Sequence, residues 1–303
     1  MNFLDNKPLN HILNELFVPY AQRVPDVITI SLGMKNLGLI SKQEDIVNDH
    51  IAFRTLGIPN LGISSFERIF LHHGYTKQDH YFFPKKKLDA YWYKPPHEGY
   101  PRVFISELKV KSLSKKAQQI IHHYTNSIQE DPLNQVDLKN VDDVVSFLHK
   151  ALWELPRLAD YNALLSESEY GAWVLYNRYY LNHYTISVHE LPAPYHELKS
   201  FNKFLKSIGI KLNDAGGEIK ISRDGLLLQS STVAQSIQAT FAEGETAEIA
   251  GSYVEFAERL PLLEYAKLPK DKLRNFHRRE GFETGNADKI FESTFREQIH
   301  KHL

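Results

Sequence analysis

Two stretches of this chain follow the same order of predicted elements, and this internal repeat constrains the fold more than any other feature. Each opens with a strand in which a histidine follows Asp or Asn, in DHIAFR (49–54) and NHYTIS (182–187). A short amphipathic helix ending at a glycine and two or three more strands follow. The last strand of each contains a glutamate, in VFISEL (103–108) and YVEFAE (253–258). The pattern β-α-β-β(-β) therefore occurs twice and predicts two similar modules.

The segments outside the repeat are predicted to be mostly helical. Helices are expected at 8–23 and 26–38, and an inserted helical region at about 112–168, after which GAWVLYNRYY (171–180) is expected to return to strand. We expect one elaborated α+β domain over residues 1–303. Its predicted parts are module one (about 45–111), the helical insertion, module two (about 170–262) and a C-terminal closing segment (about 263–303).

Composition excludes several classes of function. Lys plus Arg number 36 and Asp plus Glu 37. The net charge of −1 therefore gives no positive electrostatic field that would attract nucleic acid. The chain has no cysteine, so disulfides, thiolate metal sites and thiol nucleophiles are excluded. Neither a secretory signal nor an apolar run of about 20 residues is present. We therefore expect a cytoplasmic protein with no membrane contact, in which any metal is held by His and carboxylates.

Strand alternation places the ligand-type residues of three strands on shared faces. His50 and Arg54 lie on one face of the first strand, because side chains alternate sides along a strand. His183 lies on the polar face of NHYTISVH, and Tyr253 and Glu255 share a face of YVEFAER. One polar strand face is equally consistent with exposure to solvent. Three such faces, each opposite an apolar face, favour a polar cavity inside a curled sheet.

His50, His183 and Glu255 are the candidate metal ligands. Two imidazoles and one carboxylate leave up to three positions open on an octahedral metal, which suits non-heme Fe(II) oxygen chemistry. The same ligands could hold Mn²⁺, or Zn²⁺ with a bound water. The residue types alone leave these metals open.

Arg54 indicates the class of substrate. Its Cα is expected roughly 13 Å from that of His50, at about 3.3 Å per residue along one strand face. A guanidinium in the cavity could grip a substrate carboxylate bidentately while another part of the substrate binds the metal. The alternative is a structural ion pair with Glu107 or Glu258.

Two further residues are weaker candidates for the site. Glu107 occupies the position in the repeat that matches Glu255, and could be a fourth ligand. Tyr253 could donate a hydrogen bond near the metal. Asp49 and Asn182 precede the two histidines and are expected to point away from the cavity, so they are not predicted as ligands.

Taken together in order, several motifs make the chain resemble a known family. They are DHIAFRTLG, PRVFISEL, NHYTISV, GLLLQSST, YVEFAER and GFETGNADKIFEST, and they span about residues 45–295. The chain resembles the domain of unknown function 1338 (DUF1338) family, associated with 2-oxoadipate dioxygenase/decarboxylase, or hydroxyglutarate synthase. The resemblance implies a fold related to the vicinal-oxygen-chelate fold, in which paired βαβββ modules curl around a metal.

The resemblance also implies roles for individual residues. His50, His183 and Glu255 would be ligands of Fe(II), Arg54 would bind a substrate carboxylate, and the segment around Gly285 and Asn286 would help to close the pocket. The implied reaction converts 2-oxoadipate, or a similar 2-oxo diacid, and O₂ to 2-hydroxyglutarate and CO₂. Both oxygen atoms enter the products, and lysine degradation is the implied pathway.

Two other functions compete with this one. The first is a glyoxalase-type lyase or isomerase that uses Zn²⁺, Ni²⁺ or Mn²⁺ and a fourth ligand such as Glu107. The second is a non-enzymatic carboxylate-binding protein. Oxygen uptake with 2-oxoadipate separates the dioxygenase from both. The sequence gives no indication of the oligomeric state.

Overall fold

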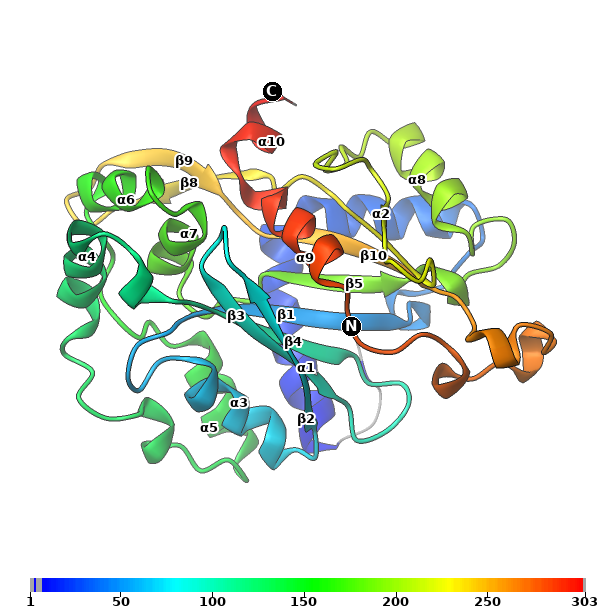
Figure 1. Ribbon diagram of the computed structural model, residues 1–303, viewed down its shortest axis with the longest axis horizontal. Helices are drawn as coiled ribbons and strands as arrows, with labels where there is room; N and C mark the ends of the chain where they lie inside the picture. Colours follow the sequence, from blue (N-terminus) through cyan, green and yellow to red (C-terminus); the bar gives the residue numbers. More distant parts are fainter. Residues whose placement is uncertain (1–2, 4–6, 302–303) are drawn as a thin grey trace.

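A computed structural model describes residues 3 and 7–301, and in this part of the chain one eight-stranded sheet dominates the fold (Figure 1). The strand order is β2-β3-β4-β1-β5-β10-β7-β6. The strands are β1 (Asn48–Leu56), β2 (Thr76–Phe83), β3 (Leu88–Lys94), β4 (Arg102–Leu108), β5 (His183–Ser187), β6 (Lys220–Ile221), β7 (Leu227–Ser231) and β10 (Tyr253–Arg259). A separate hairpin consists of β8 (Ser236–Thr240) and β9 (Thr246–Ala250).

The sheet consists of two equivalent halves joined at their first strands. β1 pairs in parallel with β4, and β5 pairs in parallel with β10, so the last strand of each half lies beside its first. β1 and β5 pair antiparallel with each other and form the seam between the halves. The internal repeat is thus present in three dimensions, and the predicted α+β fold with a curled central sheet is confirmed.

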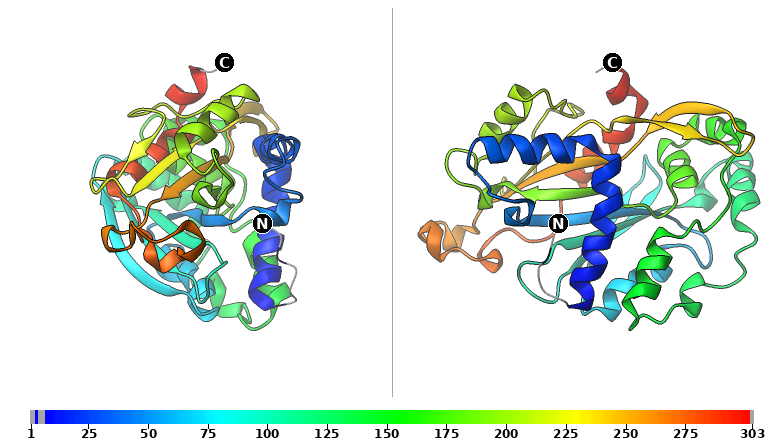
Figure 2. Two further views of the ribbon diagram at one scale, coloured as in Figure 1. Left: turned by 90° about the vertical axis from the view of Figure 1, so that its right-hand side faces the viewer. Right: turned by 180° about the vertical axis from the view of Figure 1, so that it is seen from behind.

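Helices cover the convex face of the sheet. They are α1 (Pro8–Arg23), α2 (Pro25–Asn36), α3 (Ile63–His72) and α8 (Leu198–Ser207). The apolar strand faces pack against them through ring contacts, namely Phe53–Phe66 (4.8 Å), Tyr184–Phe17 (5.1 Å) and Phe256–Phe201 (5.3 Å). The view from behind in Figure 2 shows α1 and α2 on this side of the sheet. The side chains that alternate with these rings therefore face the concave side.

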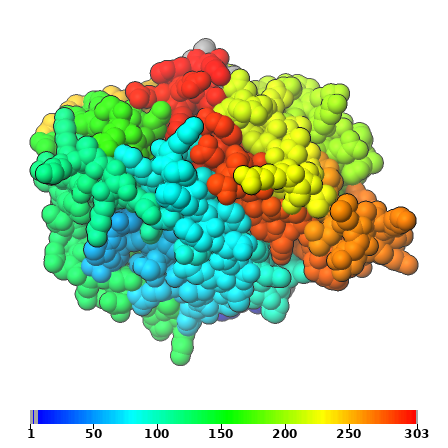
Figure 3. All heavy atoms as spheres, viewed as in Figure 1, coloured from blue at the N-terminus to red at the C-terminus, as the bar shows by residue number. Residues whose placement is uncertain are grey.

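The concave side is filled by chain from the insertion and from the C-terminal segment. These pieces are α7 (Glu169–Asn177), α9 (Thr284–Ile290) and the 3₁₀ turn η8 (Phe291–Thr294). Figure 3 shows the C-terminal segment, in red, lying between the strands of the first half, in cyan, and the second half, in yellow. The polar strand faces are therefore enclosed between the sheet and this cover.

The segment expected to resume the β pattern at 171–180 is helical over most of its length. α7 begins after Ser168, whose hydroxyl accepts a hydrogen bond from the backbone N–H of Gly171. The six residues from Tyr170 to Leu175 are all buried, so helix burial on every side removes the polar–apolar periodicity that distinguishes a helix from a strand. Module two therefore starts its first strand at His183.

The remaining helices lie at the periphery. They are α4 (Lys115–Thr125), α5 (Val141–His149) and α6 (Leu158–Leu165) of the insertion, and α10 (Arg296–His300) near the C-terminus. Within the described ranges, no helix combines the length and the apolar character required to cross a membrane.

Candidate metal centre

Three neighbouring strands bring the candidate ligands together. His50 lies on β1, His183 on β5 and Glu255 on β10, and one ligand atom from each lies within 4.8 Å of the others. The His50 Nε2–Glu255 Oε2 distance is 3.4 Å and the His183 Nε2–Glu255 Oε2 distance is 3.1 Å. All three side chains are buried. The strand order makes this possible, because β5 lies between β1 and β10.

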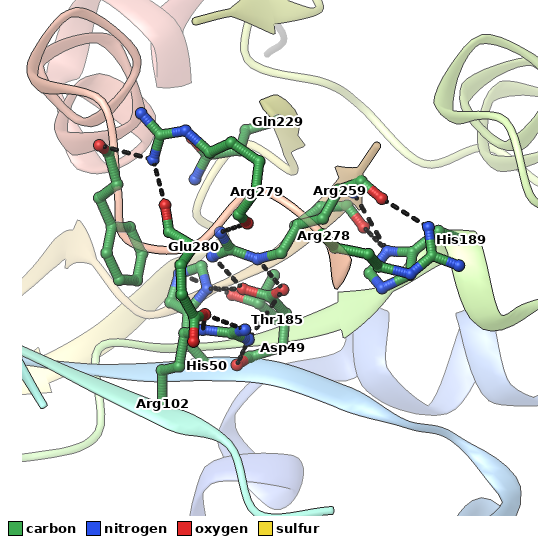
Figure 4. A network of polar contacts seen from close by, with 12 residues as sticks. Asp49, His50, Arg102, Thr185, His189, Gln229, Arg259, Arg278, Arg279 and Glu280 are labelled. Atoms are coloured by element: carbon green, nitrogen blue, oxygen red, sulfur yellow. Dashed lines mark hydrogen bonds and ion pairs between the residues drawn. The ribbon is translucent and has the colours of Figure 1, made fainter. Parts of the chain in front are cut away.

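The residue before each histidine fixes its ring. Asp49 Oδ1 lies 2.8 Å from His50 Nδ1 (Figure 4). Asn182 Oδ1 lies 3.0 Å from His183 Nδ1. Each Nδ1 therefore donates to an oxygen, and each Nε2 faces Glu255, although His50 Nε2 also lies 3.0 Å from Thr185 Oγ1. Asp49 and Asn182 are not ligands, as expected, but each contacts the ring of its neighbour. Sequence reasoning missed this role, although an Asx residue before each repeated histidine was a visible signal.

A chain of amides holds the carboxylate. Gln229 Nε2 donates to Glu255 Oε1 at 2.6 Å, and Asn286 Nδ2 donates to Gln229 Oε1 at 3.0 Å. Glu255 Oε2 therefore remains for the side of the histidines. Asn286 thus acts on the site through Gln229. Sequence reasoning named Asn286 but missed Gln229 as the link to Glu255. Gly285 is exposed on the outside of α9.

The electrostatics of the three side chains are coupled. Burial lowers the pKa of His50, but Glu255 and Asp49 outweigh burial and raise that pKa above its ordinary value, so a metal would have to displace a proton from this ring. Burial raises the pKa of Glu255, but the adjacent His50 and His183 outweigh burial and bring its pKa down to about 2. Burial lowers the pKa of His183 to about 4. The carboxylate is therefore ionised and His183 is neutral at pH 7. These ring nitrogens and the carboxylate oxygen, all buried and convergent, fit a divalent cation.

The register of the two halves shows that Glu107 does not correspond to Glu255. His50 pairs with Arg102 and His183 pairs with Tyr253, so the position equivalent to Glu255, two residues further along, is Phe104. Glu107 corresponds to Glu258 by the same count. The expected repeat match of Glu107 with Glu255 is wrong.

Glu107 and Glu258 instead share a structural role. Glu107 Oε2 accepts the backbone N–H of Ile63 at 2.8 Å, and Glu258 Oε2 accepts that of Leu198 at 2.7 Å. Ile63 and Leu198 are the first residues of α3 and α8, so each carboxylate binds the N-terminus of the helix in its own half. The structure therefore does not bring Glu107 to the candidate metal ligands.

Arg54 is buried in the same concave space. Its side chain is 1% exposed, and its Nη1 and Nη2 donate to Thr294 Oγ1 (2.9 Å) and to the carbonyl oxygen of Phe291 (3.2 Å). Its guanidinium lies 5.1 Å and 5.2 Å from the ring centroids of Tyr170 and Trp173. The ion pair considered for Arg54 is absent within the described structure, where Glu107 and Glu258 bind helix N-termini.

Two buried polar atoms in this space lack a partner. Arg54 Nε and the Tyr253 hydroxyl have no hydrogen-bond acceptor or donor among the described residues. The Tyr253 ring lies against that of His183, with 4.6 Å between centroids. Unpaired buried polar groups are costly, so these two atoms indicate the place of a polar group that the protein itself does not supply.

The cavity at the centre is small and mostly apolar. It is lined by His50, Phe104, His183, Gln229, Tyr253, Glu255, Phe282, Ala287, Ile290 and Phe291. Its volume is about 20 Å³, which is space for about one water molecule. α9 and η8 supply Ala287, Ile290 and Phe291, so the segment expected to close the pocket does lie over it.

Comparison with known proteins identifies the family. A model of the family described as 2-oxoadipate dioxygenase/decarboxylase matches residues 12–268. The chain belongs to the 2-oxoadipate dioxygenase/decarboxylase family. A curated family relative from Arabidopsis thaliana, 2-oxoadipate dioxygenase/decarboxylase, chloroplastic, is 44% identical over 301 residues, covering 95% of this chain and 78% of the relative. Its chloroplastic/amyloplastic counterpart from Oryza sativa subsp. japonica is 45% identical over 266 residues, covering 84% and 71%.

Solved structures agree with the family assignment. The hydroxyglutarate synthase from Oryza sativa, solved in complex with 2-oxoadipate, has a TM-score of 0.87 and 40% identity, covering 99% of this chain and 96% of that one. A putative glyoxalase superfamily protein from Ralstonia eutropha JMP134 has a TM-score of 0.70 at 23% identity, covering 89% and 84%. The latter supports the fold alone, which is of the vicinal-oxygen-chelate type that the sequence resemblance implied.

The expected cytoplasmic location is contradicted by the relatives of this family. Both curated relatives carry a plastid location in their names, chloroplastic in one and chloroplastic/amyloplastic in the other. The sequence argument failed because it considered only secretory signals and membrane spans, and neither bears on import into plastids.

Proposed function

We propose that this protein is an Fe(II)-dependent 2-oxoadipate dioxygenase/decarboxylase that converts 2-oxoadipate and O₂ to 2-hydroxyglutarate and CO₂. The observation that carries the proposal is the buried convergence of His50, His183 and Glu255 in a chain of this family. Three protein ligands leave positions on the metal for a chelating 2-oxo acid and for dioxygen. The 40% identity to a hydroxyglutarate synthase solved with 2-oxoadipate supports the choice of substrate.

The chain's own residues would hold the metal through two imidazoles and one carboxylate, which together carry a single negative charge. His50 and His183 contribute neutral nitrogens and Glu255 one negative charge, so a bound divalent ion retains a net positive charge for the substrate. Asp49, Asn182 and Gln229 orient these ligands through the hydrogen bonds described above. Bound there, ferrous iron would supply the redox chemistry that lets dioxygen react with a 2-oxo acid.

Arg54 and Tyr253 would bind the carboxylate distant from the metal. Arg54 is a buried cation with a free Nε, and Tyr253 offers an unpaired hydroxyl beside His183. A charge-assisted, bidentate hydrogen bond to this carboxylate would fix the position of the substrate's carbon chain between its two carboxylates. Phe104, Ile290 and Phe291 would surround its methylene groups and exclude water from the reacting end.

Phe104 disfavours the glyoxalase-type alternative. This ring occupies the position in the first half that Glu255 occupies in the second, and it lines the cavity. A lyase with four protein ligands would require a carboxylate or imidazole there. The benzyl side chain supplies no ligand atom, so a metal bound here would keep a position for substrate or dioxygen, as an oxygenase needs.

The proposal is tested by oxygen uptake. The protein is reconstituted with Fe(II) without oxygen, mixed with a panel of 2-oxo acids, and then exposed to air in an oxygen electrode. We expect 2-oxoadipate to consume one O₂ per CO₂ released, and ¹⁸O₂ to place both labelled atoms in 2-hydroxyglutarate, one in the new carboxylate and one in the hydroxyl, while the CO₂ stays unlabelled. Protein that carries iron but consumes no oxygen with 2-oxoadipate would contradict the proposal. Zn²⁺-loaded protein is the matched control and should be inactive.

A further inference from the structure

Arg259, on the strand that carries Glu255, forms a buried ion pair behind His50. Its side chain is 1% exposed, as is that of Asp49. Nε of Arg259 lies 2.6 Å from Asp49 Oδ2, and Nη2 lies 2.9 Å from Oδ1. The same Oδ1 accepts the hydrogen bond from His50 Nδ1 at 2.8 Å. Figure 4 shows the three side chains in this order.

The third nitrogen of this guanidinium binds the C-terminal segment. Nη1 of Arg259 donates to the carbonyl oxygens of Arg279 (2.9 Å) and Gly281 (2.8 Å). The next residue, Phe282, lines the cavity, and its ring centroid lies 4.8 Å from that of His50. One side chain therefore contacts both the support of a candidate ligand and the backbone that covers it.

The two halves of the molecule balance charge differently at this position. Asn182, which holds His183, is neutral, whereas its counterpart Asp49 is a carboxylate. Burial raises the pKa of Asp49, but Arg259 and Arg102 outweigh burial and hold that pKa well below its ordinary value. Arg102 is the more distant partner, at 3.5 Å, and its other nitrogens contact Glu280. Arg259 is thus the main counterion of Asp49. Its positive charge balances the carboxylate, so the pair as a whole is neutral, as Asn182 is in the other half.

We propose that Arg259 is a positioning residue with two linked tasks. Through Asp49 it holds His50 in the orientation that binds the metal, and through Arg279 and Gly281 it keeps Phe282 closed over the cavity. The inference rests on the proposed function for the identity of the metal and the substrate. Since one guanidinium performs both tasks, opening the cover removes two carbonyl acceptors that hold this guanidinium in place against Asp49.

Two substitutions separate these tasks. Lysine in R259K can pair with Asp49, but a single ammonium cannot span the carboxylate and two carbonyl oxygens as the planar guanidinium does. Methionine in R259M fills a similar volume and can do neither. R223M, at a residue whose side chain is 95% exposed, is the matched control. Circular dichroism melts verify that each variant is folded.

Metal binding is read from the visible spectrum of bound Co²⁺, and 2-oxoadipate binding from its change without oxygen. For R259M we expect metal affinity to fall by about tenfold or more, the range seen when a partner of a metal-bound histidine is removed. For R259K we expect near-normal metal affinity and about tenfold weaker 2-oxoadipate binding. In D49N/R259M a neutral amide replaces the ion pair, as at His183, so metal affinity should recover while 2-oxoadipate binding stays weak.

The outcomes distinguish this inference from the proposed function. R259M with the metal affinity of the unmodified protein would overturn the positioning of His50, and R259K with unchanged 2-oxoadipate affinity would overturn the hold on the cover. Unmodified protein that binds Co²⁺ but never turns over 2-oxoadipate with iron would contradict the proposed function alone. Unmodified protein that binds no metal would overturn both.

Discussion

Each candidate metal ligand is oriented by a short-range contact from a specific neighbour. Asp49 and Asn182 hold the two rings, and Gln229 holds Glu255. Because these contacts occupy the other hydrogen-bonding atom of each ligand, the remaining atoms face one another. The site is therefore preorganised by the protein.

Removing one imidazole should remove the metal. We expect His183→Ala to lower Fe(II) affinity by at least about a hundredfold and to abolish oxygen uptake, because two ligands cannot replace three. The measurement is metal content after gel filtration together with a Co²⁺ titration. His72→Ala changes an exposed histidine of α3 and should leave both unchanged. Stoichiometric iron in His183→Ala would exclude this residue as a ligand.

Substitution of Arg54 should separate metal binding from substrate binding. We expect Arg54→Met to retain metal but to weaken 2-oxoadipate binding about thirtyfold or more, because a charge-assisted pair is lost. The comparison substrate is 2-oxohexanoate, which lacks the distal carboxylate and should bind both proteins about equally. Normal 2-oxoadipate turnover by Arg54→Met would show that its assigned role is wrong.

Strand alternation alone could place His50, His183 and Glu255 on one side of the sheet, because only the period of the strand is needed. It could not assign Asp49 and Asn182 their role, since a residue on the opposite side was taken to be out of reach of its neighbour's ring. Gln229 and Arg259 were missed because their roles depend on which strands are neighbours, and that is fixed by long-range pairing.

Strand register decides which residues of the two halves are equivalent. The motifs VFISEL and YVEFAE suggest that their glutamates match, but the pairing of β1 with β4 and of β5 with β10 places Phe104 opposite Glu255 in the repeat. Glu107 binds the N-terminus of a helix, whereas Glu255 is a candidate ligand. Nothing in either motif distinguishes these two roles, because the residue type is the same and only the register differs.

Placing a carboxylate at position 104 should create a fourth ligand. We expect Phe104→Glu to bind Co²⁺ more tightly, by about tenfold, and to lose oxygen uptake because the position for substrate is filled. Phe104→Leu keeps the apolar wall and should retain both metal and activity. The measurements are the Co²⁺ spectrum and the oxygen electrode. Full activity in Phe104→Glu would show that this position is not part of the metal's surroundings.

Helix α7 shows the limit of prediction at the level of elements. Helices α1, α2, α3 and α8 follow from periodicity, because each has one buried face. The strands of both halves follow from their β-prone residues and the breakers between them, although β1, β5 and β10 are buried on both faces. α7 packs between the sheet and the rest of the insertion, so its sequence is apolar and aromatic on all sides. Local pattern therefore favoured a strand, and tertiary burial decided for a helix.

At the scale of the whole molecule, buried His189 makes stability depend on pH. His189 lies between the backbone of Ala257 and that of Arg259, and burial, assisted by Arg278, lowers its pKa to about 3. The folded state thus disfavours the protonated ring. This histidine contributes stability above pH 6.5, its ordinary pKa, which is lost as pH falls toward 3.

Thermal melts over this range test the assignment. We expect the Tm of the unmodified protein to fall as pH decreases from 6.5 to 3, and His189→Gln to show a shallower decrease because glutamine cannot take up a proton. The variant should be less stable at pH 7, where the ring fits its pocket. Parallel curves for the two proteins would assign the acid sensitivity to other groups.

The seam between β1 and β5 would give a bound metal a structural role besides its chemical one. His50 belongs to the first half, and His183 and Glu255 belong to the second. A metal bound to all three would therefore cross-link the two halves at the seam. Neither half alone could assemble the three ligands. If the chain were cut within the helical insertion, a bound ion would strengthen the association of the two fragments, and a chelator would weaken it.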